Sequence, residues 1–107
     1  MSDDFNPPPD FHVSVDTSVQ PPCVVVWGEL ELVTCAAFRD ALSEAAEVTD
    51  KTVAVDFSHL TFLGSTGIRE LVRLLERVDR IDVRGAAPIV RRAFEAAGLP
   101  ANVQLVD

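Results

Sequence analysis

Apolar and polar residues follow two different periods along the chain from about residue 11 onwards. Strict alternation predicts a half-buried strand, whereas apolar residues that recur every three to four positions predict the buried face of a helix. Alternating or β-branched runs predict strands over residues 11–16, 23–32, 53–57, 81–85 and 102–107. The helical repeats are Phe38, Ala41, Leu42, Ala45 and Val48, then Ile68, Leu71, Val72, Leu75 and Val78, then Ile89, Val90, Ala93, Phe94 and Ala97. The predicted order is therefore two strands followed by alternating helices and strands.

Residues with special backbone properties mark several boundaries. Thr34 is expected to cap the first helix, and Pro88 and Gly98 are expected to begin and end the last one. Gly28 lies inside an apolar strand, which indicates a β-bulge or a close backbone contact. Residues 60–63 are expected to form a connector. Strands separated by helices usually run parallel with right-handed crossovers, so the pattern predicts one α/β domain with a mixed sheet and one layer of helices.

A small polar turn, Gly64-Ser65-Thr66-Gly67, precedes the second predicted helix. The first N–H groups of a helix have no partners within it, and the helix dipole is positive at that end. A phosphate group on Ser65 or Thr66 would therefore meet free donors and a favourable field. Helix capping by the two hydroxyls is the simpler explanation of this turn.

Two segments carry a resemblance to a known family. The first is Asp56-Phe57-Ser58-x-Leu60-x-Phe62-Leu63-Gly64-Ser65-Thr66-Gly67-Ile68, and the second is Gly28-Glu29-Leu30-Glu31-Leu32-Val33-Thr34. They resemble the signature of STAS domains, in particular of the bacterial anti-sigma factor antagonists. The resemblance implies a STAS-like (SpoIIAA-like) mixed β-sheet of four to five strands with helices mainly on one face, over residues 11–107. Residues 1–10 are acidic and proline-rich, and are expected to form a disordered or loosely attached tail.

The resemblance also implies a phosphorylation switch. In the family, an ATP-dependent serine kinase of the GHKL type, which is also the anti-sigma factor, phosphorylates the first hydroxyl of the turn. That position is Ser65 here, with Thr66 as the second choice. The unphosphorylated antagonist binds the kinase and releases a sigma factor, whereas the phosphorylated form does not bind. The partner-binding residues are then expected to be Glu29, Glu31, Gly64, Ser65, Thr66, Gly67 and Arg69.

The turn departs from the family pattern at one position. The family usually has Asp before the acceptor serine, where this chain has Gly64. The missing carboxylate indicates either altered recognition by the kinase or loss of phosphorylation. Glycine also allows a positive φ at Gly64, and Gly67→Val is expected to damage the turn if Gly67 adopts such a φ. Glu31 stands where Asp is usual in the second segment and keeps the charge on a longer side chain.

Composition limits the classes of partner. The chain of 107 residues carries a formal net charge of −8, which opposes binding to nucleic acid or to an anionic membrane surface. No apolar run is long enough to span a bilayer, and no secretory signal is visible. Cys23 and Cys35 lack metal-binding spacing and are expected to be buried, as is common for free cysteines in a reducing cytoplasm. A cytoplasmic monomer or weak dimer is expected.

No set of residues in the sequence is typical of an enzyme, and neither a cofactor nor a metal is expected. His12 and His59 fit no metal motif and are expected on the surface, and the turn of residues 64–67 is not the nucleophile elbow of a hydrolase. Two other functions stay open. One is a STAS subunit docked on a lipid-trafficking ATP-driven transporter or an anion transporter. The other is a small sensor that binds nucleotide at this turn; the turn contains no Lys or Arg, which counts against a sensor, although Arg69 is close.

Overall fold

The computed structural model describes residues 11–106, so the expected tail of residues 1–10 lies outside the described residues. The elements in chain order are β1 (His12–Asp16), β2 (Cys23–Leu30), α1 (Cys35–Ala46), β3 (Thr52–Leu63), α2 (Ser65–Leu74), β4 (Arg80–Arg84), α3 (Pro88–Ala97) and β5 (Val103–Val106). Every predicted strand and helix is therefore present, in the predicted order.

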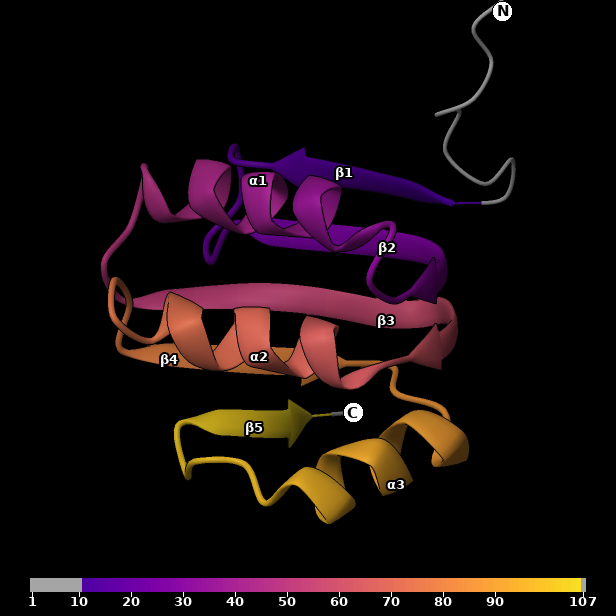
Figure 1. Cartoon of the computed structure of the whole chain (residues 1–107). Helices are drawn as coiled ribbons and strands as arrows, with labels where there is room; N and C mark the ends of the chain where they lie inside the picture. The colour runs from indigo at the N-terminus through magenta and orange to yellow at the C-terminus, as the bar shows by residue number, and fades with distance from the viewer. Residues whose placement is uncertain (1–10, 107) are drawn as a thin grey trace, which may run out of the picture.

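The described strands form one five-stranded sheet in the order β1-β2-β3-β4-β5. β1 is antiparallel to β2, and every other neighbouring pair is parallel. Figure 1 shows α1 and α2 side by side across one face of this sheet, with α3 near the edge formed by β5. The predicted mixed sheet with helices mainly on one face is confirmed. Because parallel strands end at the same edge of a sheet, the loops after β2, β3 and β4 gather at what we call the carboxyl edge.

The core lies between this face of the sheet and the helices. Phe57 of β3 lies at its centre, and its ring centroid is 6.1 Å from that of Phe38 in α1 and 6.2 Å from that of Phe94 in α3. All three rings are almost completely buried. Burial of an aromatic side chain of this size stabilises a fold by roughly 1.5–3 kcal/mol, so these rings fix both helices on the sheet.

β3 is longer than predicted. Residues 60–63, expected as a connector, form its last part and pair with β2, where Leu63 lies opposite Leu30. The register shifts between Gly28 and Glu29, which confirms the irregularity expected at this glycine. Such shifts interrupt the strict alternation of apolar and polar residues, which is why alternation alone did not predict this part of β3.

The predicted buried faces of the helices are confirmed in part. Val72 of α2 is exposed, and Leu74 is buried in its place. Val48 lies beyond the end of α1 and Ile89 lies in the first turn of α3, and both are exposed. The exact rotation of a helix on the sheet depends on its tertiary packing, which a repeat of three to four residues does not specify. Among the described helices, none has the length and apolar composition needed to cross a bilayer.

Some element boundaries match the prediction closely. Pro88 begins α3, and Gly98 ends it in the left-handed conformation with φ of 68°. β2, in contrast, ends at Leu30, two residues earlier than predicted, so that Leu32 and Val33 lie in the loop before α1. This difference matters for the site described below.

The face of the sheet away from α1 and α2 carries the two histidines. Their rings flank Trp27 of β2, with centroid distances of 5.1 Å to His12 and 5.4 Å to His59. His59 therefore lies in β3 and not in a connector, although it is exposed as expected. Cys35 is buried as predicted, whereas Cys23 is only half-buried at the start of β2.

Candidate functional site

The turn that contains Ser65 lies at the carboxyl edge of the sheet, directly after β3. The backbone N–H of Gly64 donates to the carbonyl oxygen of Leu30 at 2.8 Å, which ties the turn to the end of β2. Gly64 is the N-cap residue of α2 with φ of −90°, so the positive φ allowed by the sequence is not adopted. Glycine has no side chain with which to cap the helix. Ser65 follows as the first helical residue and is exposed.

The hydroxyls of the turn do not cap α2 in this structure. Gly64 holds the N-cap position, and its carbonyl accepts hydrogen bonds from the N–H groups of Gly67 and Ile68 at 3.1 and 3.4 Å. Ser65 is exposed and Thr66 is half-buried, so the two hydroxyls differ in accessibility. A group attached to Ser65 would project into solvent beside the N–H groups of the first turn of α2.

Gly67 is buried where the first turn of α2 crosses the ends of β2 and β3. A Cβ atom at this position would lie 2.8 Å from Cγ of Leu30 and 2.9 Å from Cδ1 of Leu63. Gly67 is helical, and among the described glycines positive φ occurs only elsewhere. The reason for glycine here is therefore close packing of α2 on the sheet, and not a left-handed backbone.

Cys35 connects the start of α1 to the same turn. Its thiol donates to the carbonyl oxygen of Thr66, with a sulfur–oxygen distance of 3.6 Å. Burial raises the pKa of the Cys35 thiol, and the nearby Glu70 carboxylate raises it further. The thiol is therefore kept neutral, and it acts as a small hydrogen-bonding part of the core.

The loop between β2 and α1 is held by the buried side chain of Thr34. Its hydroxyl donates to the carbonyl oxygen of Glu29 at 2.8 Å and accepts from the N–H of Glu31 at 3.0 Å. Thr34 is the N-cap residue of α1, as predicted, but its side chain makes no capping hydrogen bond to the helix. These bonds instead shape a tight loop that projects Leu32 and Val33 outwards, with 76% and 71% of their surfaces exposed.

This loop and the Ser65 turn form one surface. The position that a Cβ would take on Gly64 is 3.8 Å from Cα of Glu31 and 3.4 Å from Cε2 of Phe62. Phe62 itself is 47% exposed. We call Leu32, Val33 and Phe62, the exposed apolar residues on the two segments that adjoin the Ser65 turn, the apolar patch. Exposed apolar side chains near one turn are typical of surfaces that bind other molecules.

The apolar patch was not among the residues predicted to bind a partner. Leu32 was assigned to the end of a strand and Phe62 to a connector, and Val33 lay between that strand and the predicted helix cap. The available signal was position: these apolar residues lie within both family segments, next to predicted turns, and not all of them can fit into the small core at a sheet edge.

The structure brings the predicted site residues together at the carboxyl edge, with different exposure. Residues 64–67 are contiguous, but Gly67 is buried and does not offer a surface to a partner. Glu29 is exposed at the end of β2 opposite Phe62, and Glu31 is half-buried. Arg69 is exposed one helical turn after Ser65, within reach of a group attached there.

Known proteins resemble this chain in sequence and in fold. The family model described as Mlab, STAS domain matches residues 13–107. The anti-sigma-F factor antagonist RsfB of Mycobacterium tuberculosis is 28% identical over 83 residues, which cover 75% of this chain and 68% of RsfB. The crystal structure of an anti-sigma factor antagonist from Mycobacterium paratuberculosis has a TM-score of 0.79 at 25% identity, over 94% of this chain and 88% of that chain.

SpoIIAA, a further anti-sigma factor antagonist, shares the fold in two states. Its unphosphorylated form has a TM-score of 0.63 at 20% identity, over 91% of this chain and 87% of that chain. The phosphorylated form from Bacillus has a TM-score of 0.63 at 19% identity, over 90% of this chain and 92% of that chain. The family match over residues 13–107, together with this shared fold, shows that the chain belongs to the STAS domain family.

Proposed function

We propose that this protein is an anti-sigma factor antagonist of the cytoplasm. Its unphosphorylated form binds an anti-sigma factor that is also a serine kinase, and so releases a sigma factor; phosphorylation of Ser65 ends the binding. The observation that carries the proposal is the exposed Ser65 hydroxyl at the first residue of α2, directly beside the apolar patch. The similarity to RsfB supports the same function.

The switch follows from elementary electrostatics. Phosphorylation adds about −1.5 to −2 charges at neutral pH. In the free protein, the N–H groups of the first turn of α2 and the side chain of Arg69 satisfy this charge without a change of fold. In a complex, the phosphate beside the apolar patch has to lose its hydration, which weakens binding. Each tenfold loss of affinity corresponds to about 1.4 kcal/mol, so a penalty of a few kcal/mol is enough to empty the complex.

Accessibility favours Ser65 over Thr66 as the acceptor. A kinase has to reach the hydroxyl in line with a nucleotide phosphate, and Ser65 is exposed whereas Thr66 is half-buried. Gly64 removes the carboxylate that the family usually has beside the acceptor. Gly64 is still the N-cap residue of α2 and is bonded to Leu30, so Ser65 keeps its place at the start of the helix without that carboxylate. The kinase would then recognise this chain by other contacts.

The test is capture of partners from a lysate of the source organism, with identification by mass spectrometry. The baits are the wild-type chain, Ser65→Asp, and Thr17→Asp as a control that adds the same charge to an exposed residue at the opposite edge of the sheet. We expect an anti-sigma factor with kinase activity to bind the wild type and Thr17→Asp but not Ser65→Asp. The purified kinase should also phosphorylate Ser65 in the presence of ATP.

Two outcomes would contradict the proposal. Capture of transporter subunits by all three baits would favour the role of a docking subunit on a transporter. Heat release on titration with GTP or ATP, without a protein partner, would favour a nucleotide sensor.

A further inference from the structure

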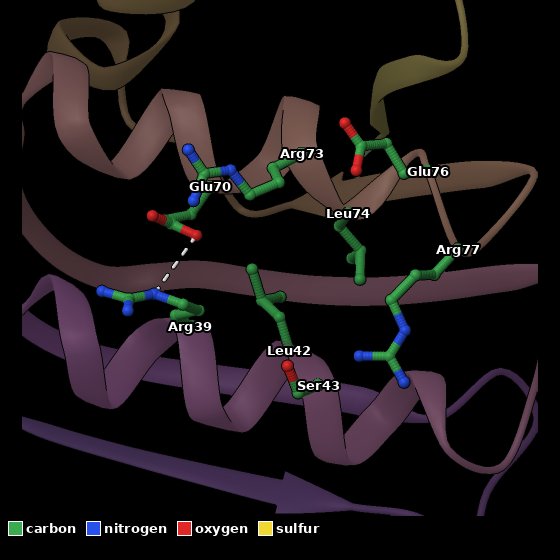
Figure 2. Close-up of a pocket in the computed structure, with 8 residues that line it drawn as sticks. All are labelled: Arg39, Leu42, Ser43, Glu70, Arg73, Leu74, Glu76 and Arg77. Atoms are coloured by element: carbon green, nitrogen blue, oxygen red, sulfur yellow. Dashed lines mark ion pairs between the residues drawn. The ribbon is translucent and has the colours of Figure 1, made fainter.

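A groove runs between α1 and α2 on the helical face of the molecule (Figure 2). Leu42 of α1 and Leu74 of α2 form its floor, and the groove holds a cavity of about 230 Å³. Both leucines are buried, so the floor is apolar and fixed by the core. This cavity is smaller than the roughly 300–1,000 Å³ typical of small-molecule sites, which favours a side chain of a protein partner over a free ligand as its occupant.

The walls of this groove are rich in arginine. Arg39, Arg73 and Arg77 line it, which is three of the nine Lys and Arg residues in a chain of net charge −8. We call it the arginine groove. Two glutamates, Glu70 and Glu76, also line it, so the arginines leave the lining with a net positive charge.

Within residues 11–106, Arg39 is the one arginine of the groove that has an ion pair. Nε of Arg39 lies 3.6 Å from Oε1 of Glu70, whose side chain is 8% exposed. This pair neutralises the buried carboxylate of Glu70. Among the described residues, neither Arg73 nor Arg77 has an ion pair or a hydrogen bond through its side chain. Two guanidinium groups are therefore free to bind carboxylates at the rim of an apolar floor.

One wall of the arginine groove is formed by α2, the helix that begins at Ser65. Arg73 is eight residues further along α2, which corresponds to about 12 Å at 1.5 Å per residue. A standard protein interface buries about 800 Å² per partner, which corresponds to a patch on the order of 30 Å across. A partner seated on the Ser65 turn is therefore large enough to reach the arginine groove as well.

We propose that the arginine groove is a second contact surface for the anti-sigma factor, and that it receives an acidic segment of that protein. An apolar side chain of the segment packs over Leu42 and Leu74, and carboxylates of the segment face Arg73 and Arg77. Docking of an amphipathic segment in a groove between two helices is a common mode of recognition. The inference rests on the proposed function, because it names where the same partner binds.

The charge of the whole chain argues for an acidic protein segment as the occupant. A net charge of −8 opposes approach to nucleic acid and to anionic membranes, whose charge extends over a large area. A short acidic segment meets mainly the local field of the groove, since screening at physiological salt limits the reach of distant charges to about 8 Å.

The test measures the affinity of the purified chain for the purified anti-sigma factor identified by capture, at low and high salt. The variant Arg73→Glu/Arg77→Glu reverses the two free charges of the groove. The control Arg84→Glu/Arg92→Glu makes the same change of net charge at exposed residues of β4 and α3. We expect a tenfold or greater loss of affinity for the groove variant at low salt, and a loss of no more than about threefold for the control.

A milder variant tests whether the loss of affinity comes from unfolding caused by the charge reversal. Arg73→Gln/Arg77→Gln should weaken binding in the same direction and flatten its salt dependence, while circular dichroism remains that of the wild type. Equal effects of the groove and control variants, with Ser65→Asp still abolishing binding, would overturn the arginine groove as a contact surface and leave the proposed function intact. Failure to find any anti-sigma factor partner would overturn both.

Discussion

Gly64 and Gly67 frame the Ser65 turn, and they act through different physical constraints. Gly64 is an N-cap residue with an extended backbone and space for a Cβ, whereas Gly67 is packed against two leucine side chains. A side chain therefore fits at Gly64, and a substitution there acts by adding a group that can cap α2. At Gly67 the constraint is steric.

Gly67→Val should destabilise the fold by about 1–3 kcal/mol, because its side chain would overlap Leu30 and Leu63 and force α2 away from the sheet. The free energy of unfolding in urea measures this loss. Gly64→Asp is the matched control, and it should be neutral or stabilising by a few tenths of a kcal/mol, since Asp is a favoured N-cap residue. Equal stability of Gly67→Val and the wild type would contradict the packing role of Gly67.

The buried thiol of Cys35 makes stability depend on pH. Its raised pKa means that the unfolded chain loses the thiol proton at a lower pH than the folded chain. Stability should therefore be unaffected below the ordinary thiol pKa and should fall as pH rises above it. Unfolding in urea at neutral and at alkaline pH measures the change. Cys35→Ala should reduce this pH dependence, and an identical pH dependence in Cys35→Ala would show that other groups cause it.

The loop between β2 and α1 is an element in which one hydroxyl determines the shape. Thr34→Val keeps the size of the side chain but leaves the Glu29 carbonyl and the Glu31 N–H without their partner. Groups left unsatisfied in this way cost roughly 1–3 kcal/mol. We expect a loss of this size in urea unfolding, and weaker binding of the anti-sigma factor because Leu32 and Val33 are no longer held outwards.

Thr34→Ser is the control for the loop, because it retains the hydroxyl and removes only a methyl group. It should lose less stability than Thr34→Val. The opposite order would mean that packing of the methyl group, and not the pair of hydrogen bonds, holds the loop.

The elements show which parts of the fold local patterns predict. Alternation and helical repeats predicted the order of all the elements, because each of them buries one face. They did not predict residues 60–63 as strand, since the register shifts of β3 arise only when it pairs with β2. They also placed Val72 inside and Leu32 in a strand, because hydrophobicity alone does not tell whether an apolar residue fills a core or forms a binding surface.

The sequence proposes only part of the candidate site. Ser65 and its neighbours follow from the polar turn before a helix and from the family resemblance, and their role stays a prediction. The apolar patch and the arginine groove combine residues from separate elements, such as Arg39 of α1 and Arg73 of α2. Their assembly depends on how parallel strands bring loops to one edge and helices to one face.

At the scale of the whole molecule, the residue proposed to be phosphorylated lies apart from the residues that stabilise the fold. The carboxyl edge presents Ser65, while the core around Phe57 lies beneath the helices and does not contact the turn's exposed hydroxyl. Because Ser65 is exposed and lies outside this core, a charge added there is expected to act on the surface and leave the fold unchanged.

This arrangement makes stability and binding respond to Ser65→Asp in opposite directions. A carboxylate in the first turn of α2 interacts favourably with the helix dipole and with Arg69 one turn on, and should stabilise the fold by about 0.3–1 kcal/mol. Calorimetry should show a Tm higher by roughly 1–6 °C at low salt, and the gain should shrink at high salt. The same variant should no longer bind the anti-sigma factor.

Ser65→Asn separates charge from shape, because it is nearly isosteric with Asp but neutral. It should leave Tm close to that of the wild type and retain more binding than Ser65→Asp. A lower Tm for Ser65→Asp would mean that loss of binding reflects damage to α2, and a surface switch would then no longer explain it. A higher Tm with lost binding would instead show that one added charge, at one exposed residue, controls the interface without cost to the fold.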